Sequence, residues 1–128
     1  MRGERAWDDA RVPRTVLIVD DFAGFRRSAR ALLEDEGFKV VGEACDGPTA
    51  LAEVERLSPA VVLLDVQLPG EDGFAVADRL ARASNPPAVV LVSTRGASAY
   101  GPYLATTSAR GFIAKADLSG DRLAALLE

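Results

Sequence analysis

The sequence predicts a three-layer α/β/α fold around one central parallel sheet. Five short apolar runs recur along the chain, and three of them are almost unbroken stretches of Val, Leu and Ile. Strands that are buried on both faces carry such continuous patterns. Helical patterns separate the runs, and this alternation is typical of parallel sheets. With 128 residues, the chain is long enough for one compact domain with a core, but not for two.

The predicted strands coincide with the apolar runs TVLIV, FKVVGEA, AVVLL, AVVLV and GFIA, at residues 15–19, 38–44, 60–64, 88–92 and 111–114. Five strand–helix units fit the flavodoxin-like strand order 2-1-3-4-5, in which the first and third strands are neighbours. Crossovers are right-handed, and ligands bind beyond the carboxyl ends of the strands where the order reverses. We therefore expect a site after the first and third strands.

Four of the five segments that follow the predicted strands have apolar residues at helical spacing. The residues expected to face the sheet are Phe25, Ala29, Leu32 and Leu33 in the first helix, Ala50, Leu51, Val54 and Leu57 in the second, Phe74, Ala77, Leu80 and Ala81 in the third, and Leu123, Leu126 and Leu127 in the last. Gly37 is expected to end the first helix, and Pro48 to lie in the first turn of the second.

The fourth helix is predicted to be short or mobile. Its segment, ASAYGPYLATTSA, contains Gly101, Pro102 and several Ser and Thr residues, which are poor helix formers. Proline lacks the amide hydrogen and is tolerated only in the first turn. We therefore expect this helix to begin near Ala99 or later.

Residues 1–13 are predicted to form an N-terminal tail, anchored by Trp7, and residues 14–128 to form the domain. The tail lacks the apolar core of a signal peptide, and no apolar run reaches the roughly 20 residues of a membrane helix. The single cysteine, Cys45, has no partner for an intramolecular disulfide. We expect an inert buried thiol and a reducing, cytoplasmic location.

The composition excludes some functions and disfavours others. The chain has no histidine, which excludes a histidine base, metal ligand or phosphohistidine on it. The net charge of -4, from 15 basic and 19 acidic residues, argues against nucleic-acid binding by this domain. Neither a nucleic acid nor a membrane is therefore expected as a partner.

Polar and charged residues stand at the carboxyl ends of four predicted strands, namely Asp20, Asp21, Asp65, Ser93, Thr94 and Lys115. Parallel strands bring these ends to one edge of the sheet. Three close carboxylates would raise one another's pKa unless a cation were bound. A few hard oxygen ligands that leave room for water suit Mg²⁺. A carboxylate beside Mg²⁺ can accept a phosphoryl group as an acyl phosphate.

Among the three carboxylates, Asp65 is the predicted acceptor. It stands alone at the end of the central strand and precedes a flexible LPGEDG loop. The side chains of Asp20 and Asp21 are expected to diverge, which suits metal and water ligation. Lys115 would share the phosphoryl oxygens with Mg²⁺, and Ser93 or Thr94 would donate a hydrogen bond to one of them.

The same motifs resemble those of response-regulator receiver domains in two-component signalling. The matching segments are VDDF (19–22), DGPTAL (46–51), LLDVQLPGEDG (63–73), VST (92–94) and ARGFIAK (109–115). Any one of them is a weak signal, whereas all of them in order and at matching spacing are highly specific. The resemblance runs from Val16 to the final helix.

The resemblance implies a role for each site residue: Asp65 as phosphoacceptor, Asp20 and Asp21 as the Mg²⁺-binding acidic pair, the backbone carbonyl of Gln67 as a further metal contact, Ser93 as the switch hydroxyl with Thr94 as second candidate, and Phe112 as the aromatic switch residue. It also implies a two-state element. A phosphoryl group draws the hydroxyl and its loop inward, and the surface of the fourth helix, fifth strand and fifth helix changes.

Two features depart from the family pattern. Ala116 follows the lysine where the family often has a proline in a cis peptide bond. A cis bond before a residue other than proline costs about 3 kcal/mol, so we expect a trans bond and a different loop path. The fourth helix also begins unusually, with Tyr-Gly-Pro-Tyr at residues 100–103.

The implied function is that of a phosphoacceptor in a two-component phosphorelay. The donor would be a sensor histidine kinase or phosphotransfer protein, and the output a downstream protein target. The chain would be a monomer or weak phosphorylation-dependent dimer, with self-phosphorylation and self-dephosphorylation as its only reactions. Alternatives are the receiver part of a longer DNA-binding regulator, a degenerate receiver, and an aspartyl-phosphate phosphatase. Such phosphatases carry a second Asp two residues after the nucleophile, where this chain has Phe22.

Each site residue also has a simpler interpretation when taken alone. Asp20 or Asp21 could cap the first helix. Ser93 and Thr94 could be turn residues, and Lys115 an ordinary surface lysine. Their joint placement at the ends of the strands favours the phosphoryl site over these readings for the aspartates, Ser93 and Lys115, and only in part for Thr94.

Overall fold

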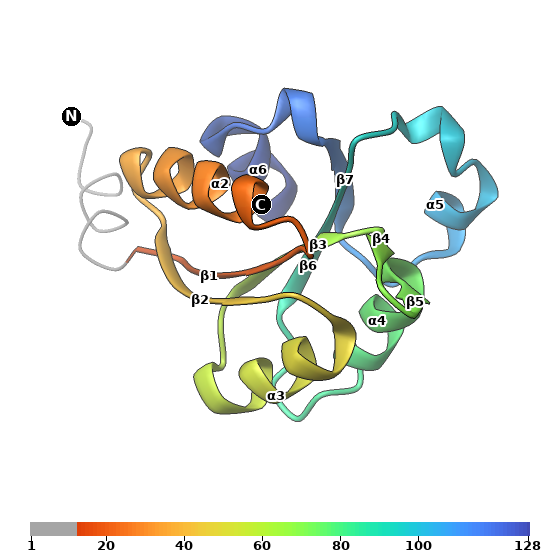
Figure 1. The fold of residues 1–128 in the computed structure, drawn as a ribbon, viewed down its shortest axis with the longest axis horizontal. Coiled ribbons are helices and arrows are strands. Elements are labelled where there is room, and N and C mark those ends of the chain that lie inside the picture. Colours follow the sequence, from red (N-terminus) through yellow and green to blue (C-terminus); the bar gives the residue numbers. More distant parts are fainter. Residues whose placement is uncertain (1–12) are drawn as a thin grey trace.

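The computed structural model describes residues 13–128 and contains a five-stranded sheet between two layers of helices (Figure 1). Its strands are β1 (Thr15–Val19), β2 (Lys39–Ala44), β3 (Val61–Asp65), β6 (Ala88–Ser93) and β7 (Gly111–Ala114). The strand order is β2-β1-β3-β6-β7, and every neighbouring pair is parallel. Counted along these five strands, this order is 2-1-3-4-5, so the predicted fold and topology are confirmed. The predicted tail, apart from Pro13, and its anchor Trp7 lie outside the described residues.

The helices divide between the two faces of the sheet. They are α2 (Ala23–Asp35), α3 (Gly47–Leu57), α4 (Gly73–Leu80), α5 (Pro102–Thr106) and α6 (Gly120–Leu127). In Figure 1, α2 and α6 lie above the sheet, while α3 and α4 lie below it. The short α5 lies beyond the edge strand β7. The remaining helical turns within residues 13–128 are two 3₁₀ segments, η1 (Ala97–Ala99) and η2 (Lys115–Asp117).

The strands are buried on both faces, which explains their continuous apolar sequences. In β1, Val16 and Ile18 pack into the cluster beneath α2 and α6, whereas Leu17 and Val19 pack into the cluster beneath α3 and α4. All four side chains are fully buried. Because its side chains pack alternately into two cores, β1 is fixed from both faces, and so is its carboxyl end, where the site begins.

Most of the predicted helix features are present. Gly37 follows α2 with a φ of +97°, a backbone conformation that glycine adopts at little cost. Pro48 lies in the first turn of α3. One inward position was predicted wrongly: Ala81 is exposed, because α4 ends at Leu80 and Ala81 lies beyond the last turn that faces the sheet. Val76, which was not among the predicted inward positions, is fully buried on that face together with Leu80.

The loops around the site differ in part from expectation. Most of the predicted LPGEDG loop belongs to a two-stranded antiparallel hairpin, formed by β4 (Gln67–Leu68) and β5 (Glu71–Asp72). Gly70 lies in its turn with a φ of +81°. The fourth helix is short, as predicted, because α5 has five residues and begins at Pro102. None of the residues of α5 is buried.

Two further expectations concern single residues. No peptide bond among residues 13–128 is cis, so the bond before Ala116 is trans, as predicted. Cys45 was expected to be buried, but it is exposed. It directly follows the last residue of β2, so it lies outside the sheet rather than in it.

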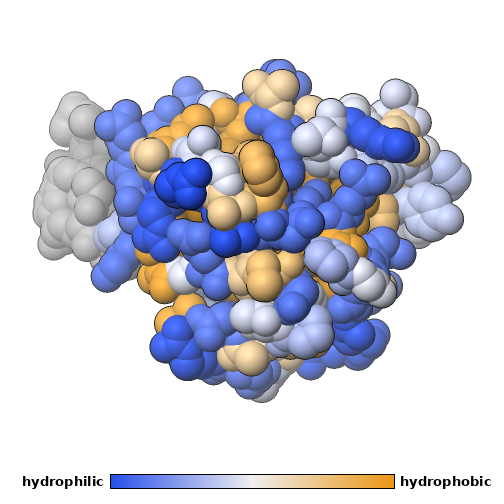
Figure 2. Space-filling model, viewed as in Figure 1, coloured by the Kyte–Doolittle hydropathy of each residue, from blue (hydrophilic) through white to orange (hydrophobic). Residues whose placement is uncertain are grey.

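Hydrophilic residues cover most of the face seen in Figure 2, and the hydrophobic patches between them are small and separate. None of the helices in residues 13–128 combines the length and apolar character that crossing a membrane requires.

Candidate functional site

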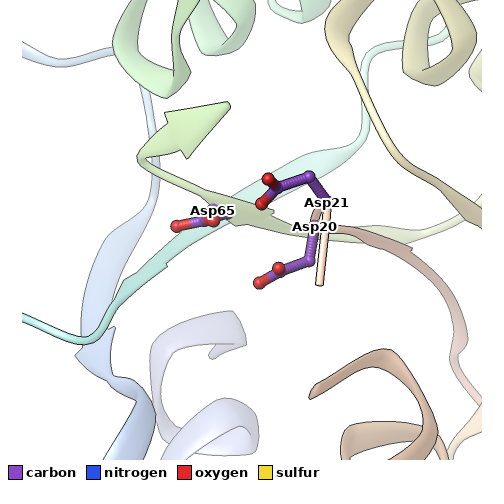
Figure 3. A group of neighbouring side chains, drawn as sticks. All are labelled: Asp20, Asp21 and Asp65. Atoms are coloured by element: carbon purple, nitrogen blue, oxygen red, sulfur yellow. The ribbon is translucent and has the colours of Figure 1, made fainter. Parts of the chain in front are cut away.

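Three aspartates meet at the carboxyl edge of the sheet. Asp20 follows β1 and Asp65 ends β3, and these two strands pair side by side. One carboxylate oxygen from each of Asp20, Asp21 and Asp65 lies within 4.8 Å of the others (Figure 3). Asp20 and Asp65 are buried, whereas Asp21 is exposed. The adjacent pair was expected to diverge, yet each contributes one oxygen to the same group.

Lys115 faces these carboxylates from the other side of the site. Its Nζ lies 2.5 Å from Asp20 Oδ2 and 3.6 Å from Asp65 Oδ2. The same ammonium group lies 4.4 Å from the centre of the Phe25 ring, which is a favourable cation–π geometry. The predicted convergence of these acids with the lysine is therefore present, and the closest ion pair of the lysine is with Asp20.

The backbone around Asp20 is held by hydrogen bonds from three directions. The N–H of Asp20 donates to the carbonyl of Ala44 at 3.0 Å, and the N–H of Phe22 donates to Asp20 Oδ1 at 2.9 Å. Arg26 donates to the carbonyl oxygen of Asp20 at 2.6 Å. The N-cap of α2 is Phe22, and no side chain caps this helix. The two acids therefore do not serve as its N-cap, which was their simpler interpretation.

Two supporting residues had no signal in the sequence. Arg26 donates to both Asp20 and Glu43, and Arg30 also donates to Glu43 at 2.9 Å. Burial alone would raise the pKa of Glu43, but the hydrogen bonds from Arg30 and Arg26 outweigh this and lower it. The buried end of β1 is thus tied to β2 through α2. Neither motif nor spacing predicts this link, because it joins elements that meet only in the folded chain.

Asp65 is the buried acid at the end of the central strand. Its Oδ1 accepts a hydrogen bond from the N–H of Gln67 at 3.2 Å, and the side chain of Gln67 is exposed. Gly73 packs against the backbone of Asp65 and Val66, where a Cβ atom would lie 2.8 Å from the Cα of Val66. Burial, and then the charge of Asp20, raise the pKa of Asp65 to about 6. Lys115 opposes this shift but does not cancel it.

The raised pKa predicts a pH-dependent stability in the absence of a bound metal. The pKa of Asp65 is about 6 in the folded protein against an ordinary value of 3.8, so the folded state holds this proton more tightly. The protonated Asp65 carboxyl contributes its full stabilisation below about pH 4, and this stabilisation is lost as the pH rises through about 6. The shift corresponds to an upper limit of about 3 kcal/mol, because water on the side of the exposed Asp21 screens the charges of the site.

We therefore expect Asp65→Asn to unfold at higher urea concentration than the wild type at about pH 7.5 in the presence of a chelator. Near pH 4.5 the difference should shrink, because the wild-type carboxyl is then protonated in the folded state. The matched control is Asp35→Asn, an exposed aspartate at the end of α2. A difference between Asp65→Asn and the wild type that does not change with pH would contradict this account.

The two predicted hydroxyl residues lie in different surroundings. Ser93 ends β6 and is fully buried. Its Oγ lies 2.6 Å from the hydroxyl of Tyr100 and accepts a hydrogen bond from the N–H of Arg95 at 3.0 Å. Thr94 is exposed and lines a surface pocket together with Lys115. Of the two, Ser93 is the one enclosed at the strand end.

Phe112, the predicted aromatic switch residue, lies in β7 and is partly buried. Its ring centre is 5.8 Å from that of Tyr100, which in turn lies 5.7 Å from Phe74. Tyr100 had appeared in the sequence only as part of an unusual helix start. Its contact with Ser93 becomes visible only in three dimensions.

The arrangement fits a divalent cation with hard ligands. The structure contains three carboxylates within reach of one point. Among residues 13–128, the buried Asp20 Oδ2 has no hydrogen-bond partner and is paired with Lys115 by charge. Burial is the main cause of the raised pKa of Asp65, and the charge of Asp20 adds to it, so a bound cation would offset repulsion between these two acids. Oxygen ligands of this kind, with an exposed side open to water, suit Mg²⁺.

Comparison with known proteins agrees with this geometry. The model of the response regulator receiver domain family matches residues 16–128. The transcriptional regulatory protein PdtaR of Mycobacterium tuberculosis is 40% identical over 93 residues, which cover 73% of this chain and 45% of that protein. A protein-glutamate methylesterase/protein-glutamine glutaminase of Myxococcus xanthus is 47% identical over 85 residues, covering 66% of this chain and 24% of that protein.

The fold also matches a solved structure closely. The signal receiver domain of the response regulator NarL from Mycobacterium tuberculosis superposes with a TM-score of 0.77 at 32% identity, covering 90% of this chain and 97% of that one. The chain spans less than half the length of the two curated relatives above. With a family match over nearly its whole length, and with the acids and the lysine gathered at one edge of the sheet, the chain belongs to the response regulator receiver domain family.

Proposed function

We propose that this receiver domain accepts a phosphoryl group on Asp65, with Asp20, Asp21 and the backbone carbonyl of Gln67 as additional ligands of Mg²⁺. The observation that supports this most directly is the gathering of three carboxylate oxygens within 4.8 Å of one another, next to the ammonium group of Lys115. If Asp20 and Asp21 only capped α2, there would be no reason for Lys115 to lie beside Asp20 and Asp65.

In the proposed reaction, an oxygen of Asp65 attacks the phosphorus of a phosphodonor. A new bond forms between that oxygen and phosphorus, the bond from phosphorus to the donor's leaving group breaks, and the leaving group keeps the electron pair. Attack requires the ionised carboxylate, and a pKa of about 6 leaves Asp65 mostly ionised at neutral pH. When bound, Mg²⁺ would neutralise the carboxylates and the phosphoryl oxygens.

Residues of the chain supply the remaining contacts. Lys115 lies 3.6 Å from Asp65 Oδ2 and would neutralise a phosphoryl oxygen attached there. Ser93 would turn its hydroxyl toward the phosphoryl group, with the exposed Thr94 as the second candidate. Phe112 would then change rotamer and alter the surface formed by α5, β7 and α6.

The proposed partners follow from family membership. A sensor histidine kinase or phosphotransfer protein would donate the phosphoryl group, and a downstream protein target would bind the switched surface. The domain would act in the cytoplasm, as a monomer or weak phosphorylation-dependent dimer, and its own chemistry would be limited to gaining and losing the phosphoryl group. PdtaR is named as a transcriptional regulator, which keeps the receiver of a longer DNA-binding regulator as an alternative.

The phosphatase alternative is less favoured. It requires a nucleophile at the end of the first strand, but Asp20 there is fully buried and paired with Lys115. Asp65, at the end of the central strand, is not the closest partner of Lys115, and the ammonium group 3.6 Å from its Oδ2 is placed to neutralise an oxygen of a phosphoryl group attached there.

Beryllofluoride, a mimic of a phosphoryl group on aspartate, provides the test. With Mg²⁺ present, amide NMR shifts are expected to centre on Asp65, Ser93, Phe112 and Lys115. Mg²⁺ alone should shift only the surroundings of Asp20, Asp21 and Asp65. The variant Asp65→Ala should lose the beryllofluoride shifts. Saturable shifts that persist in Asp65→Ala would place the acceptor elsewhere and overturn the proposal.

A further inference from the structure

The hydroxyl of Tyr100 engages the residue proposed to act as the switch. Ser93 Oγ lies 2.6 Å from the Tyr100 hydroxyl, which is a short hydrogen bond between two neutral groups. Ser93 Oγ also accepts the N–H of Arg95 at 3.0 Å. A serine hydroxyl has one hydrogen to donate and two lone pairs. Ser93 is fully buried, so water does not compete with Tyr100 for the serine hydroxyl.

From these contacts we propose that Tyr100 is a latch that holds Ser93 in its resting position and must release it when Asp65 is phosphorylated. This inference rests on the proposed function. Whichever hydroxyl donates, the contact draws Ser93 Oγ toward Tyr100. If the Ser93 hydroxyl shifts to a phosphoryl oxygen on Asp65, it has to give up its contact with Tyr100. The resting state is therefore stabilised by a hydrogen bond that the phosphorylated state gives up.

The ring of Tyr100 ties this hydroxyl to the predicted aromatic switch. Its centre lies 5.8 Å from that of Phe112 and 5.7 Å from that of Phe74, in tilted and edge-on geometries. Phe74 in turn stacks on Tyr103 at 5.5 Å. Release of Tyr100 would therefore disturb Phe112 directly, and the effect would reach the start of α5 through Tyr103.

The segment that carries Tyr100 has few contacts that would hold it in place. η1, which precedes it, and α5, which follows it, have no buried residues. Gly101 has a φ of +45° with no neighbouring atom within 4 Å of where a Cβ would be. A cleft of about 430 Å³, lined in part by Gln67, Phe74 and Tyr103, lies beside the Tyr100 ring. Few buried contacts and free space beside the ring allow it to shift without disrupting the core.

The test compares the two tyrosines of the chain. Tyr100→Phe removes the latch oxygen and keeps the ring, so the resting state loses a hydrogen bond that the active state does not use. Beryllofluoride with Mg²⁺ should then bind about threefold to tenfold more tightly than to the wild type. Tyr103→Phe is the matched control, because Tyr103 is 65% exposed and none of the hydrogen bonds within residues 13–128 involves its hydroxyl. Its affinity should equal that of the wild type.

A double-mutant cycle separates the latch from a general packing role. In a Ser93→Ala background the partner hydroxyl is absent, so adding Tyr100→Phe should leave the affinity for beryllofluoride unchanged. Incorporation of 3-fluorotyrosine gives a second readout, since two tyrosines yield two ¹⁹F signals. Beryllofluoride should displace the Tyr100 signal far more than that of Tyr103.

The outcomes are distinct. An unchanged affinity in Tyr100→Phe, or the same gain in the presence and absence of Ser93, overturns the latch while the phosphoacceptor site stands. An equal gain in Tyr103→Phe has the same consequence. If wild-type protein shows no binding of beryllofluoride that depends on Asp65, the phosphoacceptor proposal fails, and the latch fails with it.

Discussion

Replacing Asp65 by asparagine is expected to abolish phosphoryl uptake, with a loss of at least about a thousandfold in rate. The amide oxygen carries no negative charge and cannot form the acyl phosphate. Because the substitution keeps the shape of the side chain and removes a carboxylate whose pKa is raised to about 6, the variant should remain folded. Lost uptake in Asp65→Asn would therefore report on chemistry rather than on unfolding.

The measurement is the mass gain of the intact protein after incubation with an acyl phosphate and Mg²⁺. Asp35→Asn, an exposed aspartate at the end of α2, should take up the phosphoryl group at the wild-type rate. Asp21→Asn should need more Mg²⁺ for the same rate, since Asp21 is the exposed carboxylate of the group. Uptake that survives in Asp65→Asn but disappears in Asp20→Asn would instead favour a nucleophile on the first strand, as in the phosphatase alternative.

Replacing Lys115 by methionine is expected to have the second largest effect, because it leaves buried negative charge without its partner. Lys115 Nζ lies 2.5 Å from Asp20 Oδ2, and the Asp20 side chain is fully buried. Removing one member of a buried ion pair costs about 3–5 kcal/mol. The free energy of unfolding, measured with urea and a chelator, should fall by about 3 kcal/mol, and phosphoryl uptake should slow about 100-fold.

Two variants show whether this loss comes from Asp20. Lys39→Met is the matched control, because the chain has no other lysine and Lys39 is exposed. Its stability should equal that of the wild type. Adding Asp20→Asn to Lys115→Met should recover much of the lost stability, since the unpaired charge is then gone. If Lys115→Met and Lys39→Met prove equally stable, the buried ion pair contributes nothing and the account of the site is wrong.

The sheet could be predicted from the sequence because strands that are buried on both faces appear as continuous apolar runs. Residues in β1, β3 and β6 need apolar side chains on both sides, and this produces continuous runs that can be located without any partner. The number of units and the handedness of their connections then fit the strand order 2-1-3-4-5, which is the order that the structure has. Because parallel strands end at one edge, Asp20, Asp65 and Lys115 could be assigned to one site before any distance was known.

Errors in that prediction arose where one local pattern is compatible with several structures. Ala81 fits the helical spacing, but α4 ends one residue earlier. The segment after Asp65 has the Gly and Pro of a loop, yet it pairs as the hairpin of β4 and β5. Cys45 follows an apolar strand and was taken as buried, although it lies just past the edge of the sheet. Where no residue such as the Gly37 after α2 marks an end, apolar spacing does not record where an element stops.

What the sequence determined by itself is therefore the order of the strands and the residue types at their ends. The tertiary structure alone decided the partners: Arg26 on the carbonyl of Asp20, Lys115 closer to Asp20 than to Asp65, and Tyr100 on the hydroxyl of Ser93. The physical reason is that periodicity reports the face on which a side chain lies. Which atom it touches depends on the packing of segments far apart in the chain.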